Sequence, residues 1–517
     1  MALTGWSVAE EPEPVSNLLR YIDRNWQILE RSNKDLVRAA EDPKLQAERY
    51  PVYVSPRENL DAIRQRLAAV LSPQELERLD LRVLPVDAHG LPDYPAIRQH
   101  GLLYLPHPYV VPGGRFNEMY GWDSYFIVLG LLRDGQVERA RWMTENHLYQ
   151  VEHYGRVLNA NRTYYLTRSQ PPFLTSMVLE VYRRTGDRAW LAAAVPAIQR
   201  YYEFWTSEPH HVPETGLARY YDLGDGPAPE VLSDEKDAQG RTHYDRIRAA
   251  YQARAARWNP EDYPLDLYYR DGQLTPLFYK GDRTMRESGF DPSDRFGPFN
   301  VDVVHYNPVD LNCLLHRMEV EAGDIAEALG QDRAPWDRRA AARREALQRY
   351  CWDEEKGLFL DYNFRTGKRR YYPFGTAFFP LWERLATPEQ ARRTADNLPL
   401  LERPGGLVTS PYATGNQWDA PFGWAPLQLV AVEGLANYGM RQPAERLAVK
   451  FLSLVLQEFQ RTGVIVEKYD VERRTSAVSH NIEFGYSTNE VGFGWTNAVF
   501  TRLYDWLPES RRKEVLR

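Results

Sequence analysis

The segment Pro112–Phe126 combines the residue types that bind sugars. It holds three glycines, one arginine, two carboxylates and several aromatic rings. Aromatic faces cover the C–H side of a pyranose ring, whereas arginine and carboxylate side chains hold its hydroxyl groups through paired hydrogen bonds. For this segment alone, the alternative is an aromatic-rich loop that only packs against a core. Similar combinations elsewhere in the chain favour a carbohydrate site.

Four further segments stand out, each with some of the same residue types. They are Asn159–Pro172, Arg286–Phe296, Asn416–Pro426 and Val464–Val471. The first three hold rigid prolines beside polar side chains, which fixes the backbone around them. The fourth is a short β-branched run that ends near a carboxylate. Together with Pro112–Phe126, they supply the candidate functional residues.

Two of these segments supply a carboxylate in an apolar setting. Cleavage of a glycosidic bond needs one carboxyl group that stays protonated and one that activates water or attacks directly. Asp291 lies between Phe290 and Pro292, and surroundings of this kind raise the pKa of a carboxyl group. Glu467 follows three apolar residues and could fill either role. Because the chain has 71 acidic residues, most of them expected in water, residue types alone do not single out this pair.

Composition and charge exclude several other classes of protein. A net charge of -7 argues against a nucleic-acid partner, which usually binds a basic patch. Glycine-rich phosphate loops, nucleophile elbows and Cys/His metal patterns are missing from the sequence. We therefore expect neither a metal nor a cofactor, and a small molecule as the substrate.

The sequence also gives expectations about compartment and assembly. Cys313 and Cys351 have apolar or aromatic neighbours, so we expect them buried and reduced. No apolar run approaches the ~18 residues of a membrane span, and Met1–Glu11 lacks the features of a signal peptide. We expect a cytoplasmic protein with no membrane partner. The sequence does not determine the oligomeric state, and we favour a monomer.

Helical periodicity dominates the elements that must position these residues. The predicted helices are Val15–Asn33, Leu174–Thr185, Ala189–Trp205, Leu311–Leu329, Trp336–Tyr350, Pro426–Tyr438 and Pro443–Arg461. Most follow one another in pairs joined by short glycine-bearing turns. This pattern predicts an all-α toroid of helical hairpins with the functional loops at one end, and an open superhelix is the alternative.

The domain organisation follows from the same pattern. Residues 1–70 are predicted to be an N-terminal extension that packs on the main domain, and residues 71–517 the main domain itself. Residues 206–300 are polar and rich in proline, so we expect loops that cover the site.

The segments resemble a known family once they are taken in order. Pro112–Tyr125 closely resembles the first signature of the trehalase family, and Gln417–Pro426 resembles the second. Shorter matches follow the same order: Asn161–Leu166, Arg168–Pro172, Glu287–Asp291, Pro308–Asn312, Glu467–Val471 and Gly492–Asn497. The resemblance covers residues from about 95 to 503, most of the chain.

This resemblance implies an inverting glycosidase on an (α/α)6 toroid that splits α,α-trehalose into two glucose molecules. It implies Asp291 as the catalytic acid and Glu467 as the base. The implied substrate contacts are Arg115, Phe116, Tyr120, Trp122, Asp123, Asn159, Arg168, Gln170, Gly289 and Trp418. The charges of Arg115 and Arg168 are expected to clamp hydroxyl groups and to keep Asp123 ionised.

Two departures from the family pattern affect the substrate. Ala228 stands where many trehalases have an arginine, although Glu230 is retained as a predicted contact. The usual glycine run is replaced by Ser479–Tyr486, in which Glu483 is the expected equivalent of the family's glutamate. No acidic calcium loop of the neutral-trehalase type is visible near the N-terminus.

Three alternatives stay open at this point. A sister inverting α-glycosidase on the same toroid could cleave a glucosyl or mannosyl group from glycerate, and the altered loop leaves this open. A phosphorylase on a similar toroid would depend on phosphate. A non-catalytic disaccharide-binding protein would bind without turnover, although both candidate catalytic carboxylates are present.

Overall fold

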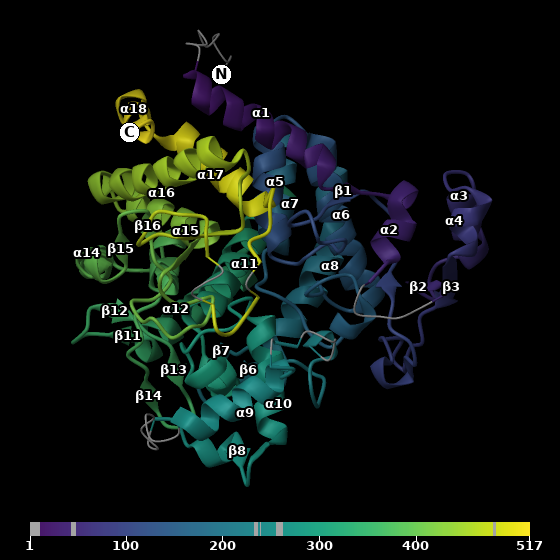
Figure 1. Ribbon diagram of the computed structural model, residues 1–517, viewed down its shortest axis with the longest axis horizontal. Coiled ribbons are helices and arrows are strands. Elements are labelled where there is room, and N and C mark those ends of the chain that lie inside the picture. Colours follow the sequence, from purple (N-terminus) through teal and green to yellow (C-terminus); the bar gives the residue numbers. More distant parts are fainter. Residues whose placement is uncertain are drawn as a thin grey trace.

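A closed ring of helices lies at the centre of the molecule, and most of these helices are labelled in Figure 1. The computed structural model describes residues 11–42, 48–231, 236–237, 239–254, 262–478, 482–486 and 488–517. The ring helices are α5 (Asp123–Arg133), α7 (Leu174–Thr185), α11 (Val309–Ala328), α13 (Phe379–Trp382), α15 (Ala425–Asn437) and α17 (Gly494–Trp506). Each packs against the next in this order, and α17 packs against α5. The fold is therefore the predicted all-α toroid, and the open superhelix is wrong.

The ring helices form the hydrophobic core because they are apolar on nearly every side. Helix α5 buries every residue from Asp123 to Leu132, and α17 every residue from Gly494 to Thr501. A helix that is hydrophobic all round is stable only when other helices surround it.

A second layer of helices surrounds this ring. It contains α1 (Glu13–Ile28), α6 (Val137–Tyr154), α8 (Arg188–Thr206), α12 (Ala334–Tyr350) and α16 (Arg441–Thr462), while α14 (Pro388–Asp396) follows α13 in the same alternating order. Helix α6 packs on α5 and α7, α8 on α7 and α11, α12 on α11, and α16 on α15 and α17. Helix α1 packs on α16 and α17. The division of the chain at residue 70 stays a prediction.

The predicted helices agree well with these bounds. Leu174–Thr185 is identical to α7, and Gly186 ends this helix at a φ of 63°, where a side chain would be strained. The other predicted helices after residue 100 end within two residues of the observed ones. The first helix ends at Ile28, five residues early, because β1 (Glu30–Arg31) pairs with β5 (Tyr109–Val110).

The expectation of loops over residues 206–300 is wrong in part. This stretch contains α9 (His243–Arg254) and α10 (Pro276–Glu287), which share a small core with Phe299 and Val301. The side chain of Thr275 caps α10 by accepting a hydrogen bond from the Phe278 N–H group, and Pro276 is the first helical residue. Threonine followed by proline is a signal for a helix start.

A small parallel sheet lies beside the toroid in the N-terminal part (Figure 1). Its strand order is β3 (Leu79–Val83), β2 (Tyr50–Val54) and β4 (Leu102–Leu103). Helices α2 (Leu36–Ala40) and α3 (Leu60–Ala68) contribute to the core beside this sheet, and α4 (Pro73–Glu77) packs against α3 and β3.

The other strands are short antiparallel segments that brace the loops. They are β6 (His211–Val212) with β7 (Leu217–Ala218), β8 (Tyr269–Arg270) with β9 (Gln273–Leu274), β11 (Trp352–Asp353) with β12 (Leu358–Phe359), β15 (Glu402–Arg403) with β16 (Gly406–Leu407), β17 (Phe422–Trp424) with β18 (Lys468–Asp470), and β13 (Tyr362–Asn363) between β10 (Tyr306–Asn307) and β14 (Lys368–Arg369). The pair β17 and β18 joins two of the segments singled out in the sequence. Helix α18 (Glu509–Val515) packs on α16.

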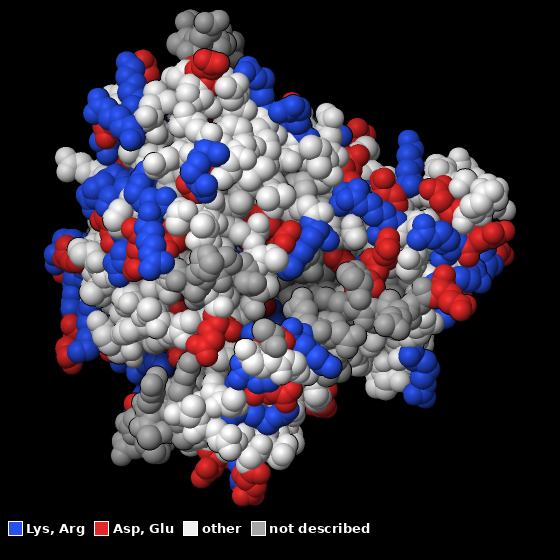
Figure 2. Space-filling view, in the orientation of Figure 1, with Lys and Arg blue, Asp and Glu red and all other residues white. Residues whose placement is uncertain are grey.

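Surface charge and cysteine chemistry agree with the sequence. Basic and acidic side chains are interspersed on the face in Figure 2. Cys313 and Cys351 are both free and buried. Within the described residues, no helix has the length and apolar character needed to cross a bilayer.

Candidate active site

A cavity of about 250 Å³ lies where the loops before the ring helices meet. Asp123 begins α5, Gln170 precedes α7, Trp424 precedes α15, and Trp495 is the second residue of α17. The ring helices α5, α7, α15 and α17 therefore present their N-terminal ends to the cavity. Its size is close to the lower end of the range for small-molecule sites.

Nearly all the predicted site residues line this cavity. They are Arg115, Phe116, Tyr120, Trp122, Asp123, Asn159, Arg168, Gln170, Glu230, Gly289, Asp291, Trp418 and Glu467. These residues come from segments more than 300 positions apart, and the closed ring brings them together.

Tryptophan rings form one wall of the cavity. Trp122 lies edge-on to Trp495 at 5.7 Å between ring centroids, and Trp418 stacks on Trp424 at 3.9 Å. Gly289 has a φ of 77°, and a β-carbon there would lie 3.1 Å from the Trp122 ring. The glycine therefore provides both the turn and the space for the ring. Flat aromatic faces of this kind cover the apolar side of a sugar.

Asp291 is a carboxyl group whose pKa is raised by its surroundings. Burial raises the pKa of Asp291 to about 6, against the opposing charges of Arg286 and Arg168. The Arg286 guanidinium lies 3.9 Å from the carboxylate, and 34% of the Asp291 side chain is exposed to the cavity. Phe290 before it is fully buried. The apolar setting that the sequence predicted is thus present, and so is its effect on the acid.

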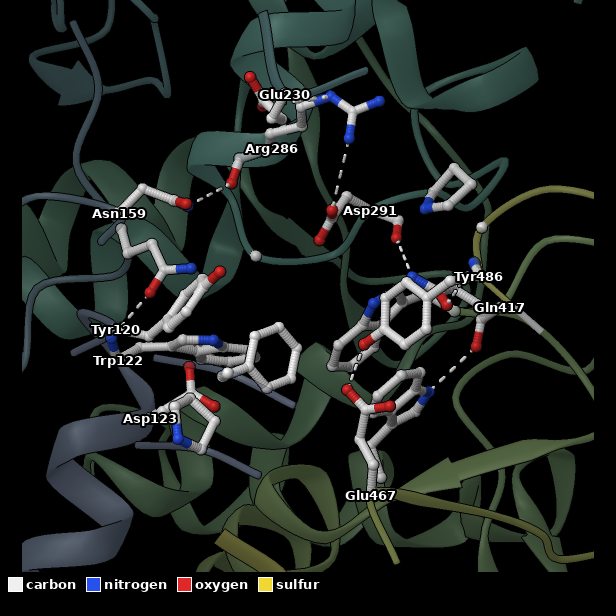
Figure 3. Close-up of a pocket in the computed structure, with 18 of the residues that line it drawn as sticks. Tyr120, Trp122, Asp123, Asn159, Glu230, Arg286, Asp291, Gln417, Glu467 and Tyr486 are labelled. Carbon is white, nitrogen blue, oxygen red and sulfur yellow. Dashed lines mark hydrogen bonds and ion pairs between the residues drawn. The ribbon is translucent and has the colours of Figure 1, made fainter. Parts of the chain in front are cut away.

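Glu467 approaches the cavity from the other side in Figure 3. Only 2% of the residue is exposed. One carboxylate oxygen accepts a hydrogen bond from the Tyr486 hydroxyl, and the other accepts one from the Lys468 ammonium at 3.0 Å. The antiparallel pairing of Trp424 with Lys468 holds this strand against the tryptophan wall.

Arginines with unused hydrogen-bond donors line the space above the two carboxyl groups. Arg168 pairs with Glu230, and the Arg286 guanidinium lies 4.0 Å from the same carboxylate. Burial alone would raise the pKa of Glu230, but Arg168 and Arg286 lower it to about 2. Among the described residues, Arg168 Nε and Nη1, Arg286 Nε and Glu230 Oε2 have no hydrogen-bond partner. Buried polar atoms are normally satisfied, so unmet hydrogen-bonding capacity sets these cavity-lining residues apart.

The expectation that arginine charge keeps Asp123 ionised is wrong. Burial first, and then the nearby charge of Glu467, raise the pKa of Asp123 well above its ordinary value. Arg115 lies instead over the rings of Phe116 and Tyr486, with its Nε atom 3.3 Å from the Glu490 carboxylate. The Arg115 guanidinium therefore interacts with these groups and not with Asp123.

Glu483 does not line the cavity. Its backbone N–H group donates to the Gly415 carbonyl oxygen at 2.8 Å, and its own carbonyl accepts a hydrogen bond from Arg246. Its predicted contact with substrate stays a prediction. Residues 479–481 of the altered loop lie outside the described residues.

Several residues in the lining were not predicted. They are Pro112, Tyr165, Val231, His243, Arg246, Arg286, Pro292, Gln417, Trp424, Gly485, Tyr486, Phe493 and Trp495. Most of them lie inside segments that the sequence had singled out, so composition within those segments was the available signal. His243 and Arg246 belong to α9, where no motif marks them. Burial lowers the pKa of His243 to about 4, so this ring is neutral near pH 7.

Comparisons with known proteins agree with one another. A sequence model of the trehalase family matches residues 10–507. A cytosolic neutral trehalase of Saccharomyces cerevisiae is 38% identical over 438 residues, which is 77% of this chain and 56% of that protein. A cytosolic neutral trehalase of Neurospora crassa is 34% identical over 555 residues, covering 94% of this chain and 72% of that one. The chain thus spans a little over half the length of the yeast relative.

Solved structures give the same picture for the fold. The neutral trehalase Nth1 from Saccharomyces cerevisiae superposes with a TM-score of 0.80 at 33% identity, covering 97% of this chain and 96% of that one. A mannosylglycerate hydrolase from Thermus thermophilus has a TM-score of 0.50 at 19% identity, covering 76% of this chain and 95% of that one. The second likeness concerns the fold alone.

Proposed function

Because this chain belongs to the trehalase family, we propose that it hydrolyses α,α-trehalose to two glucose molecules with inversion at one anomeric carbon. The observation that carries the proposal is the pairing of two carboxyl groups in one cavity. Asp291 has its pKa raised to about 6, while Glu467 faces the cavity between two hydrogen-bond donors. The cavity otherwise offers aromatic faces and two arginines, Arg168 and Arg286, which suit a sugar.

In the proposed reaction, protonated Asp291 gives its proton to the oxygen that bridges the two glucose units. Glu467 takes a proton from a water molecule as that water attacks the anomeric carbon from the opposite face. The carbon–oxygen bond to the leaving glucose breaks, and the new hydroxyl has the β configuration. Room for the water requires the two carboxyl groups to lie roughly 6.5–9.5 Å apart, whereas a separation near ~5 Å would indicate a retaining enzyme.

The other predicted site residues have supporting roles in this proposal. Trp122 and Trp418 cover the apolar faces of the two rings. Arg168, with Glu230 beside it, binds hydroxyl groups, as does Arg286. The remaining proposed substrate contacts are Arg115, Phe116, Tyr120, Asp123, Asn159, Gln170 and Gly289, all of which line the cavity. We also propose that the protein acts in the cytosol, because the named relatives are cytosolic enzymes.

Proton NMR of the anomeric region tests the reaction directly. Purified protein with trehalose should release α- and β-glucose in equal amounts before mutarotation mixes them, at the same rate with and without phosphate. Release of α-glucose alone would contradict inversion, and dependence on phosphate would indicate phosphorolysis. If trehalose is left intact, glucosyl- and mannosyl-glycerates become the next substrates to test, although no specific contact in the cavity favours them.

A further inference from the structure

The segment Ile482–Tyr486 reaches the catalytic base through the Tyr486 side chain. The Tyr486 hydroxyl donates a hydrogen bond to Oε1 of Glu467, as Figure 3 shows. Its ring lies 4.0 Å from the Lys468 ammonium and 4.7 Å from the Arg115 guanidinium. Two cations on one aromatic ring hold it in a fixed orientation.

We propose that Tyr486 is a positioning residue, which fixes Glu467 through its hydroxyl and ties it through Gln417 to the backbone of Asp291. The proposal rests on the catalytic roles given above to the two carboxyl groups. It assigns the segment Ile482–Tyr486 a role in setting the distance between acid and base.

Gln417 is the link between the two catalytic residues. Its Nε2 atom donates to the backbone carbonyl oxygen of Asp291, and its Oε1 atom accepts a hydrogen bond from the Tyr486 N–H group at 3.4 Å. The neighbouring Gly485 has a φ of 112°, and a β-carbon there would lie 2.7 Å from the Gln417 side chain. Only glycine permits this close approach.

The hydrogen bonds on Glu467 leave room for a water molecule. A carboxylate has about four acceptor positions. Tyr486 takes one on Oε1, and Lys468 takes one on Oε2. The remaining positions can accept the nucleophilic water while the side chain stays held. Burial and the charge of Glu467 raise the pKa of Tyr486 well above its ordinary value, so the hydroxyl remains a donor.

The segment that carries Tyr486 is itself anchored on its outer side. The N–H groups of Glu483 and Phe484 both donate to the Gly415 carbonyl oxygen, at 2.8 and 3.0 Å. The Gln417 N–H group donates to the Phe484 carbonyl oxygen at 3.2 Å, and the Phe484 ring packs on Phe299. The backbone therefore holds Tyr486 in place, and loss of its hydroxyl alone should leave the segment folded.

Tyr486→Phe tests the proposal with the smallest change. We expect kcat for trehalose to fall about 10- to 100-fold with KM within about 2-fold, because a misplaced base affects the transition state more than ground-state binding. Tyr371→Phe makes the same change at an exposed tyrosine and should leave both constants unaltered. Gln417→Ala should lower kcat as well, and the double variant should lose less than the product of the two single losses.

Two outcomes would overturn the proposal. One is an unchanged kcat in Tyr486→Phe, and the other is a raised KM with kcat intact, which would make Tyr486 a substrate contact. Crystal structures of the parent protein and Tyr486→Phe give a readout that does not depend on the substrate. A shift of the Glu467 carboxylate by roughly 1 Å or more supports positioning, and an unmoved carboxylate refutes it. If the parent protein fails to cleave trehalose, the proposed function fails while this structural arm still decides the inference.

Discussion

Two groups of charged side chains lie around the same ring of helices, and they are paired differently. One is the proposed active-site cavity, with Asp291, Glu467, Arg168 and Arg286. The other, here called the helix-core network, consists of Arg317, Glu321, Glu383, Glu433 and Arg502. Both contain arginines and carboxylates, and in the helix-core network these range from the buried Glu321 to Arg502, whose side chain is 41% exposed.

In the helix-core network each charge is paired within the protein. Arg317 lies 2.8 Å from Glu321 and 3.1 Å from Glu383. Arg502 binds Glu433 at 2.6 Å. The Trp382 ring connects the two pairs, since Arg317 stacks on it and its indole N–H group donates to Glu433. Where the structure describes the chain, none of these five charged side chains has a buried polar atom without a partner.

The cavity differs in what it leaves unpaired. Arg168, Arg286 and Glu230 keep buried polar atoms without partners among the described residues. Composition is similar in the two groups, so residue type does not separate a structural charge from a functional one. Unused hydrogen-bond capacity next to an open cavity distinguishes the functional charges from the structural ones.

The largest expected effect comes from removing either catalytic carboxyl group. Asp291→Asn and Glu467→Gln should each lower kcat for trehalose by about 10³-fold or more, because a general acid or base is lost. The fold should remain intact, as judged by thermal unfolding. Glu355→Gln changes an exposed carboxyl group and is the matched control. Activity retained in either catalytic variant would remove the role proposed for that residue.

The helix-core network should respond in the opposite way. Arg317→Met leaves Glu321 and Glu383 buried without their cation, and should lower the free energy of unfolding by about 3–5 kcal/mol. The kcat of the folded protein should not change. Arg64→Met removes an exposed pair with Asp61 and should cost at most about 0.5 kcal/mol. Denaturant titration measures both. A large loss of kcat in Arg317→Met without loss of stability would erase the distinction between the two groups.

Charge-conserving substitutions sharpen the contrast. Arg168→Lys keeps the charge but loses the planar fork that binds two hydroxyl groups, so kcat/KM should fall about 10- to 100-fold. Arg502→Lys makes the same change in the helix-core network and should leave kcat/KM unaltered. Steady-state kinetics on trehalose, with Tm as a check on folding, compares the two. Equal losses of activity would mean that both arginines act only through the fold.

The smallest effect is a shift in pH dependence. Since Asp291 must be protonated to act as the acid, kcat/KM should fall as pH rises through about 6. Arg286→Met removes a charge that lowers the pKa of Asp291, so the alkaline limb should move to higher pH. Arg317→Met should leave the limb where it is. If the alkaline limb of the pH profile stays in place in Arg286→Met, Asp291 is not the group whose ionisation sets that limb.

The sequence predicted most of the motif residues that line the cavity, but not the residues that α9 contributes to the lining. Periodicity located α7 to the residue, and the setting of Asp291 between Phe290 and Pro292 foretold the direction of its pKa shift. Closure of the ring could not be predicted from any local stretch of sequence, because it depends on contact between α17 and α5. His243 and Arg246 had no sequence signal, since only the docking of α9 brings them to the cavity.

The error over Asp123 has a similar origin. Arginines near it in the motifs suggested an ionised carboxylate. The arrangement in space puts Glu467 close to it instead and surrounds it with protein. Charges along a sequence do not reveal which of them meet across a closed ring.

Closure of the ring also has a consequence for the way this protein is made. Arg133 at the end of α5 binds Asp505 in α17, a residue 372 positions later. During synthesis the first ring helix must therefore wait for almost the whole chain before its last neighbour emerges. Until then its apolar faces lack that cover, and Glu467 and Trp495 cannot complete the cavity. A nascent chain stopped before α17 should hence hold most of the helices described above and no working site, which makes activity a sensitive report of synthesis through α17.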